Sequence, residues 1–531
     1  MRPVGARLLA SSTLVALLTA LLPAVSAPAV AGGGSTWVSA GHDIQNTRYQ
    51  NAESKIDPSN VANLAVKWQF TTGGDVSATA AVDGSTVYVP DWAGNLYAID
   101  QKTGSEVWSH KVGDYTGITG DFSTTTPVVY NSYLIFGDQG GRFGGDAWLI
   151  AVSKQTGALA WKTQVESVGW PVITQSAVVD ASGNTARVYV GVASVEDQLA
   201  ADPGYTCCSF RGSMLALDAD TGQILWKTYT VPDGYSGGAV SGSTAAIDHP
   251  RNSLYIDTGY NYSLPQDVQA CVAAAVGDNA VRACISPDDH FDSLMAIDLA
   301  TGAIKWATST LAYDAWTFAC LTGGSDCPSP AGPAYGFDQG PALFTVRSGG
   351  GKRQDLLGAG QKSGQYWTLD PSTGAVVWET QDGPGSRFGG LAWGSAVDGT
   401  RVYTADANGN QAPLTLLDGS TTTNGFWSGL DAITGEILWE TADPADPGSN
   451  GIDTGAVSAA NGVVYGCSMD PQGHMYALDA ATGDILWGFA SGGSCAAGAA
   501  ISNGVIYWGS GYSDPNPLGT PNNKFYAFGL P

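Results

Sequence analysis

Positive charge is scarce in this sequence. Its 531 residues include 23 Lys and Arg but 48 Asp and Glu, which gives a formal net charge of −25 at pH 7. No basic run interrupts this acidic balance. Such a surface repels phosphate backbones and anionic lipids, so we expect no binding to nucleic acid or membranes. The acidity favours solubility, and it would also suit a cationic electron-transfer partner.

Several sequence patterns that carry known chemistry are missing. There are five His residues and no H-E-x-x-H pair, so we expect no zinc site. No C-x-x-C-H sequence is present, which excludes covalent attachment of a c-type haem. The segment "GYSGG" at 234–238 has the spacing of a hydrolase nucleophile, but no strand–turn–helix pattern surrounds it. Charged residues make up 13% of the chain, so long solvated helices are not expected.

Beyond the first 31 residues the chain has no long apolar run. Residues 1–31 contain Arg2 and Arg7, a short apolar stretch and the small-residue ending "AVA", which is the pattern of a secretory signal peptide. The apolar stretch is short and flanked by proline, so a membrane anchor is the weaker interpretation. We therefore predict a secreted or periplasmic protein whose mature chain begins near Gly32.

Eight cysteines in an exported chain can pair completely. Short sequence separations favour three local disulfides, which would leave two adjacent cysteines to each other. The predicted pairs are Cys271–Cys284, Cys320–Cys327, Cys467–Cys495 and Cys207–Cys208. Neighbouring Cα atoms lie about 3.8 Å apart across a trans peptide, below the usual disulfide range. The last pair joins no distant segments, so we predict a flat sulfur surface there rather than a structural staple.

One pattern recurs along the chain: an apolar run, Asp, two residues, Thr-Gly, three residues and Trp. Seven copies end at Trp108, Trp161, Trp226, Trp306, Trp378, Trp439 and Trp487, and Ser153 replaces Asp in the second copy. The Asp residues (Asp100, Asp218, Asp298, Asp370, Asp431 and Asp479) are predicted turn caps, and Gly supplies the backbone freedom of the turn. Each copy is therefore a hairpin whose Trp must be buried by a neighbouring unit.

The spacing of the copies predicts the fold class. Further alternating runs lie between them, so each unit holds about four short strands, which is typical of a β-propeller. The C-terminal "KFYAFGLP" lacks a partner strand, and the early "NLAVKWQF", which contains Trp68, can supply it. This pairing would leave no free sheet edge. We predict an all-β protein, with one eight-bladed propeller of four-stranded antiparallel blades over residues 32–531.

The repeat resembles the tryptophan-docking motif of quinoprotein alcohol dehydrogenases. The segments "GVASVEDQLAADPGYTCCSFRGS", "YDAWTFAC" and "GAGQKSGQYWTLD" resemble the polyvinyl alcohol dehydrogenase-like branch of that family. The resemblance covers nearly the whole mature chain. It implies a propeller that holds pyrroloquinoline quinone (PQQ) and Ca²⁺ and oxidises secondary or polymeric alcohols. Because no haem site is present, electrons would pass to a separate acceptor such as a cytochrome c, and we expect a monomer.

The resemblance also implies site residues. Glu196 and Asp314 are the expected oxygen ligands of Ca²⁺, a hard cation that polarises the quinone carbonyl. Asp314 is also the expected general base, and Lys362 is expected to stabilise charge on the cofactor oxygen. The other expected cofactor contacts are Cys207, Cys208, Thr174, Trp393 and Asn408.

Two positions depart from the family pattern. Ala239, Val240 and Ser241 occupy the place where the family has a Trp that lies under the cofactor. Tyr260 stands where the family has a metal-binding Asn or Asp, and Asn261 would be the ligand if the loop shifts by one residue. Two other hypotheses therefore stay open. The propeller could have lost the quinone and bind a saccharide or protein, or it could be another enzyme that reuses the axial pocket.

Overall fold

The docking repeat folds as the hairpin that the sequence predicts. In the first copy, Asp100 Oδ1 accepts hydrogen bonds from the backbone N–H groups of Lys102 and Thr103 and from the Thr103 hydroxyl. Gly104 has a φ of +71°, in the left-handed region that favours glycine. This turn joins β4 (Asn95–Asp100) to β5 (Glu106–Lys111). The turn-cap role predicted for the repeat Asp is therefore confirmed here.

The repeat Trp residues pack between blades, also as predicted. A Cβ added at Gly374 would lie 2.6 Å from Trp306 Cε3, so the turn needs glycine to admit the indole. Trp306 Nε1 donates to Pro371 O at 3.2 Å, and Thr308 Oγ1 donates to Gly374 O at 2.7 Å. The same close packing occurs at Trp68–Gly104, Trp108–Gly157, Trp161–Gly222, Trp226–Gly302, Trp378–Gly435 and Trp439–Gly483.

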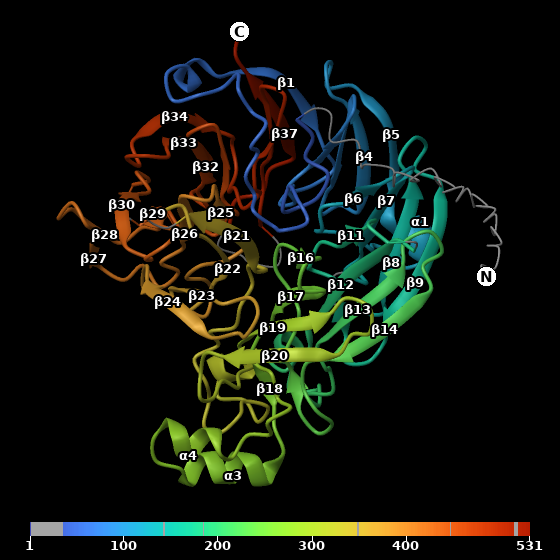
Figure 1. Cartoon of the computed structure of the whole chain (residues 1–531), viewed down its shortest axis with the longest axis vertical. Coiled ribbons are helices and arrows are strands. Elements are labelled where there is room, and N and C mark those ends of the chain that lie inside the picture. Colours follow the sequence, from blue (N-terminus) through green and yellow to red (C-terminus); the bar gives the residue numbers. More distant parts are fainter. Residues whose placement is uncertain (2–34, 142–143, 184, 348–349, 447, 514–518) are drawn as a thin grey trace. The chain divides into compact units, whose positions relative to one another are not determined.

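The structure is a computed structural model that describes residues 1, 35–141, 144–183, 185–347, 350–446, 448–513 and 519–531. The predicted signal peptide, residues 1–31, lies outside the described residues apart from Met1. The strands of residues 34–531 form eight antiparallel blades, which Figure 1 shows arranged around a common centre. The predicted eight-bladed propeller is confirmed.

The first four blades follow one another along the chain. They consist of β2 (Ala81–Asp83), β3 (Thr86–Pro90), β4 and β5; β6 (Val128–Tyr130), β7 (Tyr133–Gly137), β8 (Ala147–Ser153) and β9 (Leu159–Glu166); β11 (Val178–Asp180), β12 (Arg187–Ser194), β13 (Ser213–Asp218) and β14 (Ile224–Tyr229); and β16 (Ala246–Asp248), β17 (Ser253–Asp257), β19 (Ser293–Asp298) and β20 (Ile304–Ser309). The short β10 (Pro171–Val172) also pairs with β12.

The other four blades complete the ring. They consist of β21 (Ala342–Arg347), β22 (Arg353–Gly360), β23 (Gln365–Leu369) and β24 (Val376–Gln381); β25 (Ala396–Val397), β26 (Arg401–Asp406), β29 (Phe426–Asp431) and β30 (Ile437–Ala442); β31 (Ser458–Ala460), β32 (Val463–Cys467), β33 (His474–Asp479) and β34 (Ile485–Ala490); and β35 (Ala500–Ser502), β36 (Val505–Gly509), β37 (Lys524–Gly529) and β1 (Ala65–Thr71). Two small sheets pair β15 (Ser236–Gly237) with β18 (Asn261–Ser263) and β27 (Leu414–Thr415) with β28 (Thr421–Thr422).

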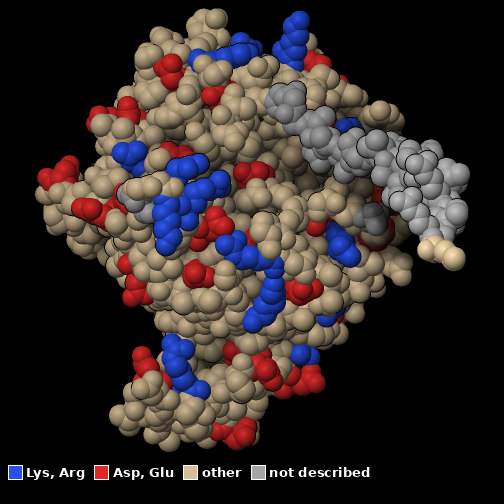
Figure 2. All heavy atoms as spheres, viewed as in Figure 1, with Lys and Arg blue, Asp and Glu red and all other residues tan. Residues whose placement is uncertain are grey.

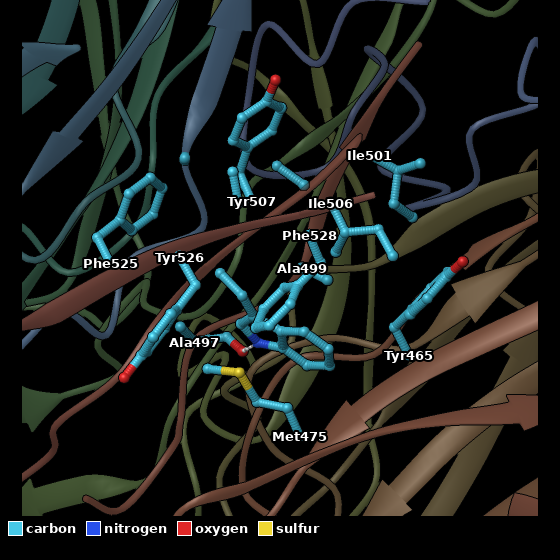
Figure 3. Close-up of a cluster of buried hydrophobic side chains, with 14 of the residues drawn as sticks. Tyr465, Met475, Ala497, Ala499, Ile501, Ile506, Tyr507, Phe525, Tyr526 and Phe528 are labelled. Carbon is cyan, nitrogen blue, oxygen red and sulfur yellow. Dashed lines mark hydrogen bonds between the residues drawn. The ribbon is translucent and has the colours of Figure 1, made fainter. Parts of the chain in front are cut away.

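The eighth blade joins the two ends of the described chain, as predicted. Strand β1 pairs antiparallel with β37, from Ala65 opposite Gly529 to Thr71 opposite Lys524. Their shared core consists of buried hydrophobic and aromatic side chains around Tyr507, Phe525 and Phe528, which Figure 3 shows beside Tyr465 and Met475 of the seventh blade. Because both ends of the described chain contribute strands to this blade, backbone hydrogen bonds between β1 and β37 close the ring.

The loops contain helices that the sequence did not predict. They are η1 (Val61–Asn63), α1 (Val112–Thr116), α2 (Glu196–Leu199), α3 (Gln266–Ala274), α4 (Asp278–Arg282) and η2 (Phe318–Leu321). Figure 1 shows α3 and α4 together at one edge, away from the blades. All eight cysteines pair as predicted, and the Cys271–Cys284 disulfide ties this helical loop together. Among the described residues, every helix is too short or too polar to cross a membrane.

The segment from Trp37 to Gln50 runs along the innermost strands of most blades. Its backbone carbonyls accept from N–H groups in five blades, at Val82, Val129, Ile247, Leu343 and Val397, at 2.7–2.9 Å. Farther along, Ala459 N donates to Arg48 O at 3.0 Å, and Gln50 Nε2 donates to Ile501 O at 3.0 Å. This segment therefore ties seven of the eight blades together where they meet.

Charged side chains are sparse on the surface. Figure 2 shows acidic and basic side chains scattered over one face, separated by wide uncharged areas. This agrees with a chain in which 13% of the residues are charged. The outer strands expose part of their apolar side chains instead, for example Val107 of β5 and Val376 of β24.

Candidate functional site

A cavity of about 290 Å³ lies where the blades meet. Seven of its lining residues stand two or three positions before the first strand of a blade: Thr79, Thr126, Ser176, Ser243, Trp393, Ala456 and Gly498. Equivalent positions of successive blades converge on the axis of a propeller, so this cavity is axial. Its volume is close to the lower limit for small-molecule sites, which begins at about 300 Å³.

The axial cavity combines aromatic walls with hydroxyl groups. The rings of Trp92 and Phe122 lie 5.3 Å apart between centroids, and Tyr512 meets Trp92 edge-on at 5.6 Å. Thr174, which also lines the cavity, has a buried Oγ1 without a hydrogen-bond partner in the described structure. Arg48 is the only charged side chain among the lining residues described. This lining suits a flat polar ligand.

A largely buried ion pair, with side chains 16% and 18% exposed, stands beside the cavity. Lys362 Nζ lies 2.6 Å from Asp338 Oδ2, and Ser241 Oγ donates to Asp338 Oδ1 at 2.7 Å, directly before the lining residue Gly242. Burial disfavours the Lys362 ammonium, but the charges of Asp338, Asp197 and Asp292 and the hydrogen bond to Asp338 together outweigh this effect and raise the pKa of Lys362. Burial, and then the charge of Asp338, raise the pKa of Tyr512 to about 12. Lys362 is therefore a fixed cation at neutral pH.

Tyr260 connects Lys362 to a second carboxylate. Its ring centroid lies 5.6 Å from Lys362 Nζ, and its hydroxyl donates to Asp197 Oδ2 at 2.9 Å. Trp316 meets the same ring edge-on at 6.1 Å. Burial raises the pKa of Asp197 to about 6. In the sequence, Tyr260 stands out only as a departure from the family's metal-binding Asn or Asp, and nothing singles out Asp197 or Asp338, although Asp197 directly follows the expected ligand Glu196.

Glu196 begins α2 and is fully buried. Its carboxylate accepts hydrogen bonds from the backbone N–H groups of Ser209 and Phe210 at 2.6–2.8 Å, and from the Tyr205 hydroxyl at 2.6 Å. These donors hold the loop that carries Cys207 and Cys208 against α2. The expected metal ligand therefore already has internal partners in this structure.

The other two expected ligands lie in a buried group of carboxyl and amide side chains. Asn261 N donates to Asp314 O at 3.1 Å, and Asn261 Nδ2 donates to Asp289 Oδ2 at 2.8 Å. Asp314 accepts the backbone N–H groups of Ala334 and Tyr335. Burial raises the pKa of Asp314, and burial together with the Asp314 charge raises that of Asp292 well above its ordinary value.

Several oxygens in this group lack partners. Asn261 Oδ1, Asp289 Oδ1 and both carboxylate oxygens of Asp292 are buried without a hydrogen bond to any described atom. A buried polar atom left unpaired costs about 1–3 kcal/mol, so native proteins keep few of them. Sequence reasoning did not single out Asp289 or Asp292, because nothing near "DDHFDS" distinguishes them from turn carboxylates.

The remaining predicted contacts divide between the cavity and its surroundings. Thr174 and Trp393 line the cavity, whereas the disulfide of Cys207 and Cys208 and the side chain of Asn408 are not part of its described lining. Asn408 Nδ2 is used within its own loop, where it donates to Ala412 O at 2.9 Å. Cys208 and Tyr260 both pack against the apolar cluster that contains Ala239 and Tyr262.

The side chains of this region fit PQQ better than they fit Ca²⁺, the two groups that the family resemblance implies. The cavity fits a flat anion, because aromatic rings, an unpartnered hydroxyl and one cation line it. A hard cation prefers oxygen ligands, and the orphaned oxygens of Asn261 and Asp292 are of that kind. However, no three His, Cys, Asp or Glu side chains of the described chain converge as metal ligands, and Glu196 is already satisfied.

Comparison with known proteins identifies the family. A model of the PQQ_2 family, described as "Outer membrane protein assembly factor BamB", matches residues 60–308 and 423–512, more than half of the chain. The chain belongs to the PQQ_2 family. This PQQ_2 propeller is 29% identical to polyvinylalcohol dehydrogenase from Sphingopyxis sp. (strain 113P3), over 95% of this chain and 78% of the relative. It is 27% identical to polyvinylalcohol dehydrogenase from Pseudomonas sp., over 90% and 73% of the two chains.

Solved structures agree on the fold. The PQQ_2 propeller matches quinohemoprotein alcohol dehydrogenase from Comamonas testosteroni with a TM-score of 0.67 and 18% identity, over 93% of this chain and 80% of that chain. A europium-containing methanol dehydrogenase matches with the same TM-score at 17% identity, over 93% and 98%. These identities establish the fold alone. Together with the two relatives above, they confirm the predicted resemblance to quinoprotein propellers of the polyvinyl alcohol dehydrogenase-like branch.

Proposed function

We propose that this protein is an exported, PQQ-dependent alcohol dehydrogenase. The observation that carries the proposal is the axial cavity, whose aromatic and hydroxyl lining lies beside the fixed cation Lys362. The names of the two relatives described above support alcohol oxidation in general. They also support secondary or polymeric alcohols, polyvinyl alcohol among them, as the substrate class of this chain.

Lys362 is proposed to stabilise negative charge that develops beside it. The bound quinone supplies the two-electron oxidant for the alcohol. Asp338 holds the ammonium in place, and Ser241 holds Asp338, so the cation is oriented before the reaction begins. A preoriented donor in a site with little water is worth far more than the same donor in bulk solvent. Tyr260 and Trp316 exclude water from one side of Lys362.

Asp314 is proposed to accept the alcohol proton. Two backbone N–H groups orient its carboxylate, and burial raises its pKa, which improves a carboxylate as a base. The charge of Asp314 also raises the pKa of Asp292, so the two carboxyls disfavour each other's ionisation. Asp314 is proposed to act on substrate that reaches this group from the side of Lys362.

The proposal includes Ca²⁺ because the side chains near Asp314 offer oxygen ligands. Asn261 and Asp314 would hold the ion. Glu196 would join them if its carboxylate gave up one of its backbone N–H donors. The orphaned oxygens of Asn261 and Asp292 support a cation in this region. Electrons are proposed to pass to a separate acceptor such as a cytochrome c. We further propose that residues 1–31 direct export and that the mature protein is a monomer.

The proposal is tested by adding PQQ, with and without Ca²⁺, to the purified protein. We expect a change in the quinone absorption spectrum, an increase in Tm and dye reduction with a secondary alcohol. Binding without dye reduction for any alcohol would favour another enzyme that reuses the pocket. No spectral change and no stabilisation would favour the alternative of a saccharide- or protein-binding propeller, for which Ala239 in place of the expected Trp is the motivating observation.

A further inference from the structure

Arg48 is a buried cation without a carboxylate partner. Its side chain is 1% exposed and donates from all three nitrogens: Nε to Val457 O, Nη1 to Ala40 O and Ser243 Oγ, and Nη2 to Thr79 Oγ1 and Ser458 Oγ. Every acceptor is a neutral carbonyl or hydroxyl. Burial lowers the pKa of Arg48 to about 9, so the guanidinium is still positive at neutral pH.

This arrangement is costly unless something offsets the charge. Desolvating an ion in a protein costs several kcal/mol, and buried charges are normally paired with the opposite charge. The chain has more than twice as many acidic as basic residues, yet no Asp or Glu occurs among the described residues that line the axial cavity. Arg48 therefore gives a local excess of positive charge to the inside of a strongly acidic protein.

The Arg48 side chain is also firmly positioned. A Cβ at Gly498 would lie 2.1 Å from Nη2, and a Cβ at Gly394 would lie 3.0 Å from Cδ, so both glycines leave room for the side chain. On either side of Arg48, Asn46 Nδ2 donates to Thr244 O and Gln50 Nε2 donates to Ile501 O. Three alternate residues of one extended segment thus reach toward different blades, and only the middle one is charged.

From this geometry we infer that Arg48 makes the axial cavity selective for an anionic aromatic ligand and contacts the carboxylate side of that ligand. The inference deepens the proposed function, because PQQ is a flat aromatic ring system that bears three carboxylates. The hydroxyls of Ser243 and Thr79 each accept a hydrogen bond from the guanidinium in this structure. When a ligand carboxylate enters, they can rotate and leave these N–H donors to it. Trp92, Phe122 and Tyr512 supply the aromatic wall for the ring.

The test measures ligand affinity, not turnover. PQQ is titrated into the full-length protein and into Arg48→Met, which keeps the length of the side chain but removes the charge. We expect affinity to fall roughly 10- to 100-fold, the usual effect of losing hydrogen bonds to a charged group. Lys55→Met is the matched control, because Lys55 follows in the same stretch of chain but bonds to Asn503 at the exposed rim. It should bind PQQ as the natural protein does.

A second comparison needs no variant, in case Arg48→Met does not fold. Benzene-1,2,4-tricarboxylate and the corresponding tricarboxamide have the same shape but differ in charge. The tricarboxylate should raise the Tm of the natural protein and the tricarboxamide should not. Equal stabilisation by both compounds would overturn the inference, as would a folded Arg48→Met variant that binds PQQ within twofold of the natural affinity.

The outcomes separate this inference from the proposed function. If PQQ binds the natural protein and Arg48→Met equally well, the role of Arg48 is wrong and the proposed function stands. If the tricarboxylate binds in an Arg48-dependent way but PQQ does not bind, the inference stands and the quinone assignment falls. If neither compound binds the natural protein, both are wrong.

Discussion

The outer hairpins of the blades, here called the rim, pair their buried polar groups, whereas the region around the axial cavity, here called the axis, leaves several unpaired. At the rim, Trp306 and Thr308 each donate a hydrogen bond to the next blade, and glycine admits the indole. At the axis, Arg48 faces neutral acceptors, and between β17 and β19 Asn261 and Asp292 bury oxygens that accept no hydrogen bond from a described donor. Unpaired buried groups cost stability, so a fold retains them where they serve something other than stability. We therefore assign stability to the rim and function to the axis.

Trp306→Ala should give the largest loss of stability. It removes a partly buried indole that packs between two blades, and it takes away one of the two donors to Pro371 O, which also accepts from the Tyr255 hydroxyl. Large-to-small changes of this kind cost about 3–5 kcal/mol in the free energy of unfolding. Denaturant titration followed by tryptophan fluorescence measures the loss.

Trp306→Phe is the matched control. It keeps most of the ring and loses one hydrogen bond, worth about 1 kcal/mol. PQQ affinity at low temperature should be unchanged in both variants. If Trp306→Ala lost PQQ affinity while still folded, the separation of rim from axis would be wrong.

Among substitutions near the axial cavity, Lys362→Met should give the largest loss of alcohol dehydrogenase activity. Removing one preoriented donor of this kind lowers kcat by about 10²- to 10³-fold. Since the variant leaves Asp338 buried without its cation, it should also lower the Tm. Steady-state kinetics and thermal unfolding on the PQQ-loaded protein measure both effects.

The double variant Lys362→Met/Asp338→Asn separates the two effects. It removes the uncompensated carboxylate, so the Tm should recover while kcat stays low. Recovery of kcat together with the Tm would show that Lys362 acts through stability and not on the reaction.

Two disulfides of different span extend the comparison. Cys467–Cys495 closes a loop with a sequence separation of 28, so replacing both residues by Ala should cost about 3–4 kcal/mol of stability. Cys207–Cys208 joins neighbours and restricts almost nothing in the unfolded chain. If the pair covers one face of the quinone, as the family resemblance implies, its double Ala variant should keep the unfolding midpoint and weaken PQQ binding. A large stability loss from Cys207→Ala/Cys208→Ala, without any change in PQQ affinity, would mark the pair as structural.

The smallest expected effect depends on pH and concerns Asp382, the residue directly after β24. Burial raises the pKa of Asp382 to about 6, above the value of about 3.9 in an unfolded chain. The folded state therefore binds more protons between these values, and its stability falls as pH rises toward about 6. Because an amide side chain carries no charge at any of these pH values, Asp382→Asn should add on the order of 2 kcal/mol at pH 8 and almost nothing at pH 4.

Asp418→Asn is the control for this pH dependence. Asp418 is an exposed turn carboxyl, and hydrogen bonds from Ser420 lower its pKa. Its substitution should bring no gain at pH 8. Urea unfolding at both pH values decides the matter, and an equal gain for Asp382→Asn at pH 4 and pH 8 would rule out charge burial as the cause.

The sequence was sufficient for the rim and insufficient for the axis, for a physical reason. The Asp-x-x-Thr-Gly turn makes its hydrogen bonds within four residues, so the pattern around Asp100 is visible in a continuous stretch. Trp68 and "KFYAFGLP" could be paired because a hairpin strand needs a neighbour. The adjacent cysteines and the three local disulfides followed from spacing alone.

The axis instead collects residues from separate blades. Arg48 bonds to Val457, 409 positions away in the sequence, and Ser241 bonds to Asp338, 97 positions away. No short stretch of sequence therefore indicates either contact. The resemblance singled out Lys362 and Glu196, but it could not indicate that the backbone N–H groups of Ser209 and Phe210 already bond to the Glu196 carboxylate. Nor could it foresee Tyr260 between Lys362 and Asp197.

The central claim is that a quinone bound at the axis is reduced by an alcohol, and one measurement addresses it directly. The protein is loaded with one equivalent of PQQ in the presence of Ca²⁺ and mixed with a secondary alcohol under anaerobic conditions, without an electron acceptor. The account predicts that the absorption of the oxidised quinone disappears in a single turnover, with one alcohol oxidised per chain, and that Lys362→Met slows this step. A loaded quinone that stays oxidised with every simple or polymeric alcohol would contradict it.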